Sequence, residues 1–419
     1  MKQQQLVVIG GGAAGFFCAV NAARMNPSLK VIIIEKSGRL LSKVKVSGGG
    51  RCNVTHSCFD ITELSRKYPR GQHFLKKILH WFNPTNTIEW FAERGVELKT
   101  EADGRMFPVS NSSQTIIDCL LNEANKFGVE VLMHTEATNI IRKENHFHLT
   151  IADSSPRCRG NLTPDYICIA SGGYPKSSMF NWLAQLGHTI EEPVPSLFTF
   201  NMPGNAITSL MGVSIDRVSI RIQGTKLQEE GPLLITHWGM SGPVILRLSA
   251  WGARQLAEKK YSFMAQLNWI PEYNEQSLRD EWPALRAQSA GQKMNGRNPF
   301  GLPQRLWQYL LGLCGIDDAR TWSTLTSAEQ NKLIKNLLAQ EFAVNGKTTF
   351  KEEFVTCGGI RLTEIDPNTM ESKKQPGVFF AGEIIDVDGI TGGFNFQHAW
   401  TSGWLAAKAV AASSSVATT

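Results

Sequence analysis

Residues 6–35 read LVVIGGGAAGFFCAVNAARMNPSLKVIIIE, and this stretch decides the fold of the chain. The β-branched run at its start has the length of a buried strand, and a second such run ends in Glu35. Between them we expect a helix over residues 13–25. Three glycines at the spacing G-x-G-x-x-G open that helix: Gly10, Gly12 and Gly15. The pattern predicts a strand–helix–strand unit that binds a dinucleotide.

Each part of this unit has a physical role. Gly10 allows a tight turn off the strand, Gly12 lets a pyrophosphate approach the backbone, and Gly15 lets the helix lie close to the strand. The N-terminus of the helix offers N–H groups and a positive dipole end to the phosphates. Glu35 lies where a carboxylate can bind the ribose hydroxyls.

Composition sets broader limits. A chain of 419 residues with 42% hydrophobic residues is long enough for two or three domains. A net charge of +6 is mild for this length, so we do not expect nucleic acid as a partner. We also expect neither a signal peptide nor a membrane span, and therefore a cytoplasmic protein.

A basic segment follows the first unit. Residues 36–51 carry five lysines and arginines and no acid, and they end in Gly48-Gly49-Gly50-Arg51. Backbone N–H groups of such a loop can form an anion-binding concavity, and Lys43 and Arg51 can reach phosphate. A solvated basic loop is the alternative. Because this basic segment comes directly after the ribose-binding acid, we favour a role in binding phosphate.

Two further glycine-rich points follow predicted strands. Residues 165–170 form a strand that ends in Ser171-Gly172-Gly173, small residues that let a ligand come close. Near the C-terminus, Gly392-Gly393 precede a helix expected to continue over residues 398–410. A helix N-terminus of this kind can stabilise negative charge, such as that of a reduced flavin.

The motifs of the whole chain resemble one known family. They are LVVIGGGAAG, KVKVSGGGRCNVTH, ICIASGG, LLITHWGMSGP, TCGGI and FAGEIIDVDGITGGFNFQHAW. Together they are similar to those of the aminoacetone-oxidase-like family of bacterial FAD-dependent oxidoreductases, also called the BaiN-like flavoproteins. Two positions depart mildly from that pattern: His56 stands where we expect Asn, and Ser171 where we expect Thr.

The resemblance implies an α/β fold with FAD bound by a discontinuous Rossmann-type domain, and an inserted β-barrel-like domain with a helical cap. The expected domains are residues 1–192 and 347–411 for the two parts of the FAD-binding domain, 193–270 for the β-rich insertion, 271–346 for the helical cap and 412–419 for a flexible tail. By motif, the following residues are expected to line the FAD site: Gly10, Gly12, Ala13, Ala14, Gly15, Glu35, Lys36, Lys43, Ser47, Gly48, Gly49, Arg51, Cys52, Asn53, Ala137, Ser171, Gly172, Gly173, Gly382, Glu383, Asp386, Gly393, Phe394, Asn395 and Phe396.

Two residues are candidates for roles in catalysis. His237, at the end of an apolar run beside a glycine turn, has the chemistry for proton transfer, but a structural histidine in a tight turn fits equally well. Arg105 could bind an anionic substrate or form a plain salt bridge. We expect no metal site, because Asp386 and Asp388 at a glycine turn fit loop or ribityl contacts better than a metal.

The resemblance points to hydride transfer through flavin N5 with a small-molecule substrate, either NAD(P)H-driven reduction of a conjugated enone or oxidation of an amine. The chain has no second G-x-G-x-x-G, so NADH or NADPH would dock transiently over the flavin. One alternative is an RNA-modifying flavoprotein, suggested by the basic residues between Arg66 and Lys77. Another is a redox sensor with a protein partner. The sequence leaves the oligomeric state open.

Overall fold

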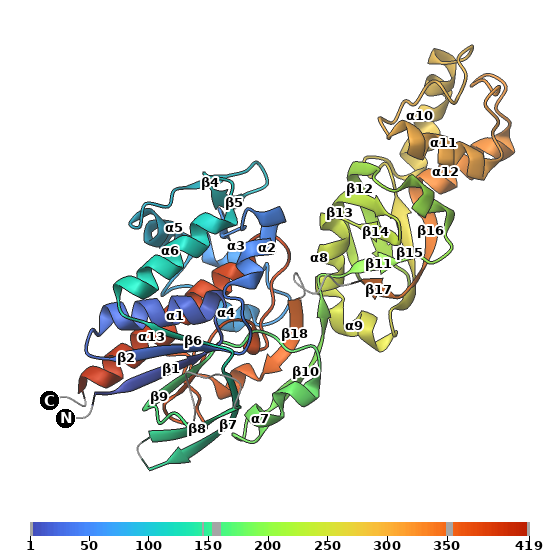
Figure 1. Cartoon of the computed structure of the whole chain (residues 1–419). Coiled ribbons are helices and arrows are strands. Elements are labelled where there is room, and N and C mark those ends of the chain that lie inside the picture. Colours follow the sequence, from blue (N-terminus) through green and yellow to red (C-terminus); the bar gives the residue numbers. More distant parts are fainter. Residues whose placement is uncertain (1–2, 145, 153–160, 349–354, 417–419) are drawn as a thin grey trace. The chain divides into compact units, whose positions relative to one another are not determined.

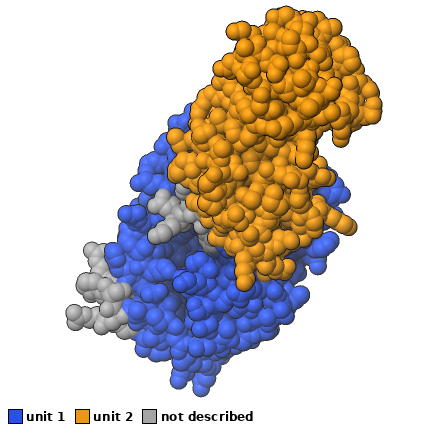
Figure 2. All heavy atoms as spheres, turned by 90° about the vertical axis from the view of Figure 1, so that its right-hand side faces the viewer, with its two compact units in different colours: residues 1–195, 350–419 blue, residues 196–349 orange. Residues whose placement is uncertain are grey.

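The structure is a computed structural model that describes residues 3–144, 146–152, 161–348 and 355–416. Figure 1 shows the arrangement of its elements. The chain forms two compact units, coloured separately in Figure 2. Unit 1 comprises residues 1–195 and 350–419, and unit 2 comprises residues 196–349. Unit 1 is therefore discontinuous in sequence.

A five-stranded parallel sheet forms the centre of unit 1. Its order is β19 (Val378–Phe380), β9 (Tyr166–Ile169), β1 (Gln5–Ile9), β2 (Lys30–Glu35) and β6 (Glu130–Met133). Val7 of β1 is opposite Ile32 of β2 on one side and Ile167 of β9 on the other. The residues of β1 from Leu6 on are buried, which explains their unbroken apolar run.

Helices cover this sheet on one side, and a hairpin lies on the other. Figure 1 shows α1 (Ala13–Met25), α6 (Ser113–Lys126) and α13 (Phe394–Val416) along one face, with the hairpin of β7 (Glu136–Lys143) and β8 (His146–Ala152) opposite. The predicted helix over residues 13–25 is confirmed. Helix α13 continues to Val416, into the segment expected to be a flexible tail; residues 417–419 lie outside the described part.

Smaller elements complete unit 1. The helices are α2 (Ser42–Gly50), α3 (Ile61–Ser65), α4 (Gln72–Ile78), α5 (Pro84–Ala92) and α7 (Asn181–Ala184). One small sheet has the order β3 (Thr55–His56), β5 (Arg105–Pro108), β4 (Leu98–Thr100), and another pairs β10 (Ile190–Ser196) with β18 (Val355–Ile360).

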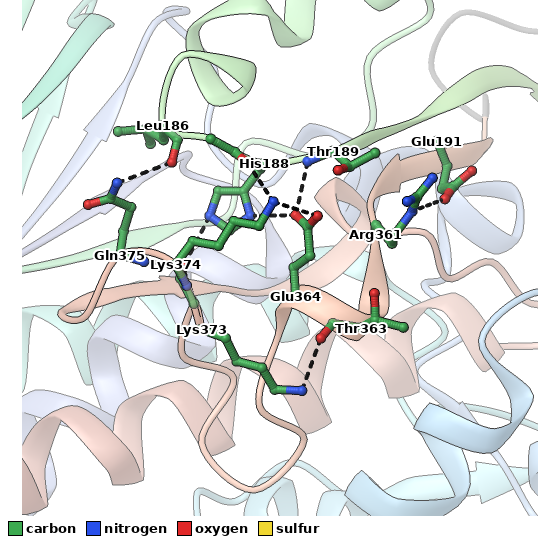
Figure 3. A network of polar contacts seen from close by, with 12 residues as sticks. Leu186, His188, Thr189, Glu191, Arg361, Thr363, Glu364, Lys373, Lys374 and Gln375 are labelled. Carbon is green, nitrogen blue, oxygen red and sulfur yellow. Dashed lines mark hydrogen bonds and ion pairs between the residues drawn. The ribbon is translucent and has the colours of Figure 1, made fainter.

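A partly buried polar network joins the two sequence parts of unit 1, as Figure 3 shows. Glu364 Oε2 accepts from the backbone N–H of Thr189 at 2.9 Å and lies 3.1 Å from His188 Nδ1. Its other carboxylate oxygen pairs with Lys374 Nζ at 2.7 Å. On the far side of the imidazole, His188 Nε2 lies 3.0 Å from Ser372 Oγ, which also accepts from two backbone N–H groups. Because both the histidine and the serine are buried and this hydroxyl is fully engaged, the arrangement is structural.

Unit 2 contains a seven-stranded antiparallel sheet. Its order is β16 (Gln340–Asn345), β15 (Ser262–Asn268), β12 (Ser214–Ile222), β13 (Gln228–Thr236), β14 (Gly239–Ser241), β11 (Thr199–Asn201) and β17 (Lys347–Thr348). The two strands at the ends of this order, β16 and β17, are consecutive in the chain, with only Gly346 between them. Strand β16 pairs with β15 and β17 pairs with β11, while the Gly346 N–H donates to the Tyr261 carbonyl oxygen at 2.8 Å and its carbonyl oxygen accepts from the Asn201 N–H at 3.1 Å. The β-rich insertion thus contains an antiparallel sheet; the expected barrel stays a prediction.

Five helices accompany this sheet: α8 (Pro243–Trp251), α9 (Ala253–Glu258), α10 (Glu275–Gln288), α11 (Gln304–Cys314) and α12 (Ser327–Ala339). Thr326 and Glu329 form a capping box at the start of α12, as the sequence predicts. One hydrophobic cluster extends from the sheet into the helices, where Trp282, Trp307 and Trp322 lie together. None of the helices in the described ranges combines the length and apolar character needed to cross a bilayer.

Candidate functional site

At the turn between β1 and α1, Gly10 and Gly15 leave no room for a side chain. Gly10 has φ +114°, and a Cβ there would lie 2.4 Å from the carbonyl oxygen of Ala170. A Cβ on Gly15 would lie 2.0 Å from the carbonyl oxygen of Gly10. The first and last glycines of the motif thus fit α1 tightly against the sheet, as predicted.

Gly12 differs from its neighbours because the space beside it is open. It is the N-cap residue of α1, its φ is −94°, and no side chain caps the helix there. A Cβ on Gly12 would meet no protein atom within 4 Å, and the same is true of Gly49 and Gly172. Open backbone at a helix N-terminus fits a pyrophosphate, since the first N–H groups of the helix lack partners within it.

Glu35 lies beside this opening with a fixed carboxylate. Its oxygens accept from the backbone N–H groups of Gly11 and Ser37, each at 2.8 Å. A carboxylate has further lone pairs, so Glu35 can still accept from ribose hydroxyls. The backbone N–H of Thr135 donates to the Glu35 carbonyl oxygen at 2.9 Å, which brings the half-buried Ala137 at the start of β7 near this acid.

The glycine-rich basic segment forms a distorted end of α2. Ser47 is extended, whereas Gly48 and Gly49 have φ of 59° and 69°. The backbone N–H of Cys52 donates to the Ser47 carbonyl oxygen at 3.0 Å and closes the loop. Burial raises the pKa of the Cys52 thiol to about 12, so the thiol is neutral, and its place in the FAD site stays a prediction.

Arg51 and Arg105 share one acid. Glu101 pairs with Arg51 Nη1 at 2.6 Å and with Arg105 Nη2 at 3.3 Å. The Arg51 guanidinium also lies 4.0 Å from the centre of the Phe107 ring, and Arg105 pairs with Asp103 at 2.6 Å. The structure therefore gives both arginines protein partners, and their roles toward phosphate or substrate stay predictions.

Residues from both sequence parts of unit 1 meet at Glu383. Its carboxylate pairs with Lys43 Nζ at 2.6 Å and accepts from the Thr356 backbone N–H at 2.8 Å. A Cβ on Gly173 would lie 2.9 Å from the same carboxylate. A Cβ on Gly382 would lie 2.8 Å from the Cβ of Ala14 in α1. The structure thus brings together predicted cofactor residues of four separate motifs.

The loop before α13 is held by Asn53 and Asn395. The Asn53 side-chain amide donates to the Thr55 carbonyl oxygen and accepts from the Gly393 N–H, each at 3.0 Å. The Asn395 side chain accepts from the Gly389 N–H at 2.8 Å and donates to its carbonyl oxygen at 3.0 Å. These bonds position the N-terminus of α13 next to the SGGGRCN segment.

Aromatic side chains lie around Phe394 and within α13, and another, Tyr174, lies beside Ser171. The Tyr68 hydroxyl donates to the Phe394 carbonyl oxygen at 2.7 Å, and the Phe394 ring stacks on His56 at 4.8 Å. Phe396 stacks on Trp400 at 5.8 Å. Lys36 lies 5.9 Å from the ring of Tyr174, whose hydroxyl donates to Ser171 at 3.0 Å.

Several polar features of this region were not predicted from the sequence. Arg70 forms a two-pronged ion pair with the fully buried Asp388, which fixes the loop that carries Asp386. Among the described residues, six buried side-chain atoms lack a hydrogen-bond partner: His56 Nδ1, Thr356 Oγ1 and His398 Nε2 in unit 1, and Trp282 Nε1, Arg320 Nε and Trp322 Nε1 in unit 2. The three in unit 1, together with the open backbone at Gly12, fit a polar ligand such as FAD.

His237 lies in unit 2, in the turn between β13 and β14. Its ring is exposed and contacts Trp238 edge to face at 4.2 Å. The Trp238 indole N–H donates to Thr199 Oγ1 at 3.0 Å, so this turn is well held. Its role in proton transfer stays a prediction.

Fold and site together define a Rossmann-type flavoprotein of the oxidoreductase class. The HI0933-like protein Rossmann domain model matches residues 4–409, and the chain belongs to this family, the BaiN-like FAD-dependent enzymes that the motifs resemble. It is thus an enzyme of a flavin-dependent oxidoreductase family, with FAD as its cofactor.

Relatives of full length support this assignment. The chain is 28% identical to the ribosomal RNA dihydrouridine synthase of Escherichia coli, covering 99% of this chain and 100% of that one. It is 27% identical to the 3-dehydro-bile acid delta(4,6)-reductase of Clostridium scindens, covering 96% and 98%. Among solved structures, the 3-ketosteroid-delta1-dehydrogenase of Sterolibacterium denitrificans aligns with a TM-score of 0.51 at 12% identity, over 97% of this chain and 99% of that one, which shows a shared fold.

Proposed function

We propose that this enzyme reduces a carbon–carbon double bond conjugated to a carbonyl group, and that a uracil base in ribosomal RNA is its substrate. Dihydrouridine is uridine with its C5–C6 double bond saturated, and that bond is conjugated to the C4 carbonyl. A 3-oxo bile acid with double bonds at positions 4 and 6 presents the same unit. The two relatives named above thus share one type of acceptor bond.

The observation that supports FAD binding in this proposal is the open backbone at Gly12, the N-cap residue of α1, where an added Cβ would meet no protein atom within 4 Å. When bound, FAD supplies hydride transfer at its N5. Glu35 would hold the ribose, and the α13 N-terminus at Gly393 would support charge on the ring system. Reduction of the conjugated bond then needs hydride at the β carbon and a proton at the α carbon.

Two parts of the reaction are proposed from sequence. Since the chain has one G-x-G-x-x-G, NADH or NADPH would dock transiently to deliver electrons. His237, with an exposed imidazole beside a glycine turn, is the proposed proton donor.

From the sequence, RNA ranked behind a small organic substrate. Two full-length relatives, from Escherichia coli and Haemophilus influenzae, are ribosomal RNA dihydrouridine synthases. For that reason we now place RNA before a small organic substrate. A free conjugated enone becomes the second candidate, and amine oxidation the third.

The test is to incubate the FAD-loaded protein anaerobically with NADH or NADPH and one acceptor. The acceptors are ribosomal RNA from cells that lack this enzyme, and a 3-oxo-4-ene steroid. We expect dihydrouridine in the nucleoside digest of the RNA, detected by mass spectrometry. Saturated steroid without dihydrouridine would move the assignment to small enones, and turnover of neither would contradict the proposed reaction.

A further inference from the structure

We propose that one surface of unit 1, formed by α4, the turn after it and the C-terminal half of α13, binds the RNA substrate. We call it the α4 face and define it by His73, Lys76, Lys77, His80, Trp81 and Lys408. The inference rests on the proposed function and adds the location of the RNA contacts.

The chain around α4 is strongly basic. Residues 64–88 contain five lysines and arginines, two histidines and no aspartate or glutamate. Within α4 and the following turn, His73, Lys76, Lys77 and His80 are exposed, whereas Leu75 and Ile78 are buried. Their spacing at i, i+3, i+4 and i+7 places the exposed set on one side of the helix.

The lysines of this face are not neutralised by neighbouring acids. Arg66 pairs with Glu63 at 2.5 Å and Arg70 pairs with buried Asp388, so these two arginines are committed within the protein. In contrast, the described residues include no ion-pair partner for Lys76 or Lys77. Two uncompensated ammonium groups on one helix face are suited to phosphate groups.

An exposed aromatic ring lies next to these charges. Trp81 is 46% exposed, although a tryptophan of a folded domain is usually well buried. Lys408 of α13 lies 4.3 Å from the centre of the Trp81 ring and 5.3 Å from that of Trp404. Trp404 in turn stacks on Phe82 at 5.4 Å. A held, partly exposed indole beside lysines is the combination that binds RNA by base stacking and phosphate contact.

The α4 face is connected to the candidate cofactor site through α13. That helix begins at Phe394, directly after the Gly392-Gly393 turn, and reaches Lys408 within the same element. At a rise of 1.5 Å per residue the separation along the axis is about 20 Å. A structured RNA can span this distance, so one molecule could contact the α4 face and present a base near the α13 N-terminus.

The experiment compares matched variants of the FAD-loaded enzyme. Lys76→Gln/Lys77→Gln and Trp81→Ala change the α4 face. Lys259→Gln/Lys260→Gln and Trp251→Ala are the controls, since Lys259 and Lys260 are an exposed pair and Trp251 is 42% exposed, all in unit 2. Binding of unmodified ribosomal RNA is measured as a function of salt, together with flavin reduction by NAD(P)H and thermal unfolding.

We expect Trp81→Ala to weaken RNA binding by about tenfold. The double lysine variant should lower the slope of log K against log salt concentration by about 1 to 2. Flavin reduction and unfolding temperature should stay unchanged, and the controls should bind RNA like the parent. Equal binding by the α4-face variants and the parent would overturn the inference, while dihydrouridine formation by all of them would leave the proposed function intact.

Two other outcomes separate the alternatives. If the parent enzyme forms no dihydrouridine and binds no RNA at low salt, the proposed function fails and this inference fails with it. If phosphatidylserine-containing vesicles, and not RNA, bind the parent and lose affinity in the α4-face variants, the face binds membranes and the RNA assignment is wrong.

Discussion

Lys43 Nζ lies 2.6 Å from Glu383 Oε2, and this ion pair joins α2 to the turn after β19. The two residues lie near opposite ends of the chain, yet both belong to motifs that predict cofactor contacts. Glu383 also accepts from the buried backbone N–H of Thr356. The carboxylate therefore links three segments at the edge of the proposed FAD site.

Substitutions of Glu383 should distinguish how much its ion pair with Lys43 and its hydrogen bond with Thr356 each contribute to the free energy of unfolding. Glu383→Gln removes the ion pair but keeps an acceptor for Thr356, and since Lys43 is 45% exposed we expect a loss of less than about 1 kcal/mol in unfolding free energy. Glu383→Ala leaves the buried N–H unpaired and should cost about 1–3 kcal/mol. Denaturant unfolding measures both, with Glu230→Ala, an exposed partner of Arg217, as control. Equal losses for Gln and Ala would show that the Thr356 bond contributes nothing.

Glycine substitutions should distinguish a folding role from a binding role. Gly10→Ala forces a Cβ to within 2.4 Å of a carbonyl oxygen and should prevent stable folding of unit 1. Gly12→Ala meets no protein atom, so unfolding of the FAD-free protein should change by less than about 1 kcal/mol while FAD affinity falls strongly.

The control is Gly312→Ala in α11, which is also free of contacts and should stabilise by about 0.5–1 kcal/mol without altering FAD binding. Calorimetric titration with FAD gives the affinities. Normal FAD binding by Gly12→Ala would contradict the placement of the pyrophosphate.

The buried Arg70–Asp388 pair should behave as a unit. Asp388 is fully buried and Arg70 nearly so, and the carboxylate raises the pKa of Arg70 against the effect of burial. Asp388→Asn removes the buried carboxylate that pairs with the Arg70 guanidinium and should lower the unfolding free energy by about 3–5 kcal/mol. The double variant Arg70→Met/Asp388→Leu should recover much of that loss. Additive losses in the double-mutant cycle would argue against this coupling.

His398 should make stability depend on pH. Burial lowers its pKa to about 3, below the usual value of 6.5, so the unfolded chain binds the proton more readily. The contribution of His398 to stability is complete above pH 6.5 and is lost as pH falls toward 3, by at most about 1.4 kcal/mol per pH unit. The variant His398→Phe should flatten the curve of unfolding temperature against pH in this window. An unchanged curve would show that His398 does not titrate as described.

Local features of the structure could be predicted from sequence, because the residues that determine each of them lie close together in the chain. The spacing of Gly10, Gly12 and Gly15 with flanking β-branched runs indicates the strand–helix–strand unit, and the structure confirms it. The capping box at Thr326 is another case, since cap and helix lie within a few residues.

Contacts between distant segments could not be predicted in this way. Nothing near Arg51 in sequence indicates that Glu101 is its partner, and nothing near Arg70 points to Asp388. The alternating pattern of residues 213–222 indicates a strand but contains no information on whether its sheet closes. Such contacts depend on which distant segments the folded chain brings together. Local patterns in a single sequence do not contain that information.

The most direct test of the central claim is an anaerobic half-reaction. FAD-loaded enzyme is reduced, freed of excess reductant and mixed with ribosomal RNA that lacks dihydrouridine, while the visible flavin absorbance is followed. We expect the absorbance of oxidised flavin to return in step with dihydrouridine formation, before any air is admitted. A flavin that stays reduced in the presence of both RNA and a conjugated enone, and reoxidises only in air, would contradict the proposed reaction.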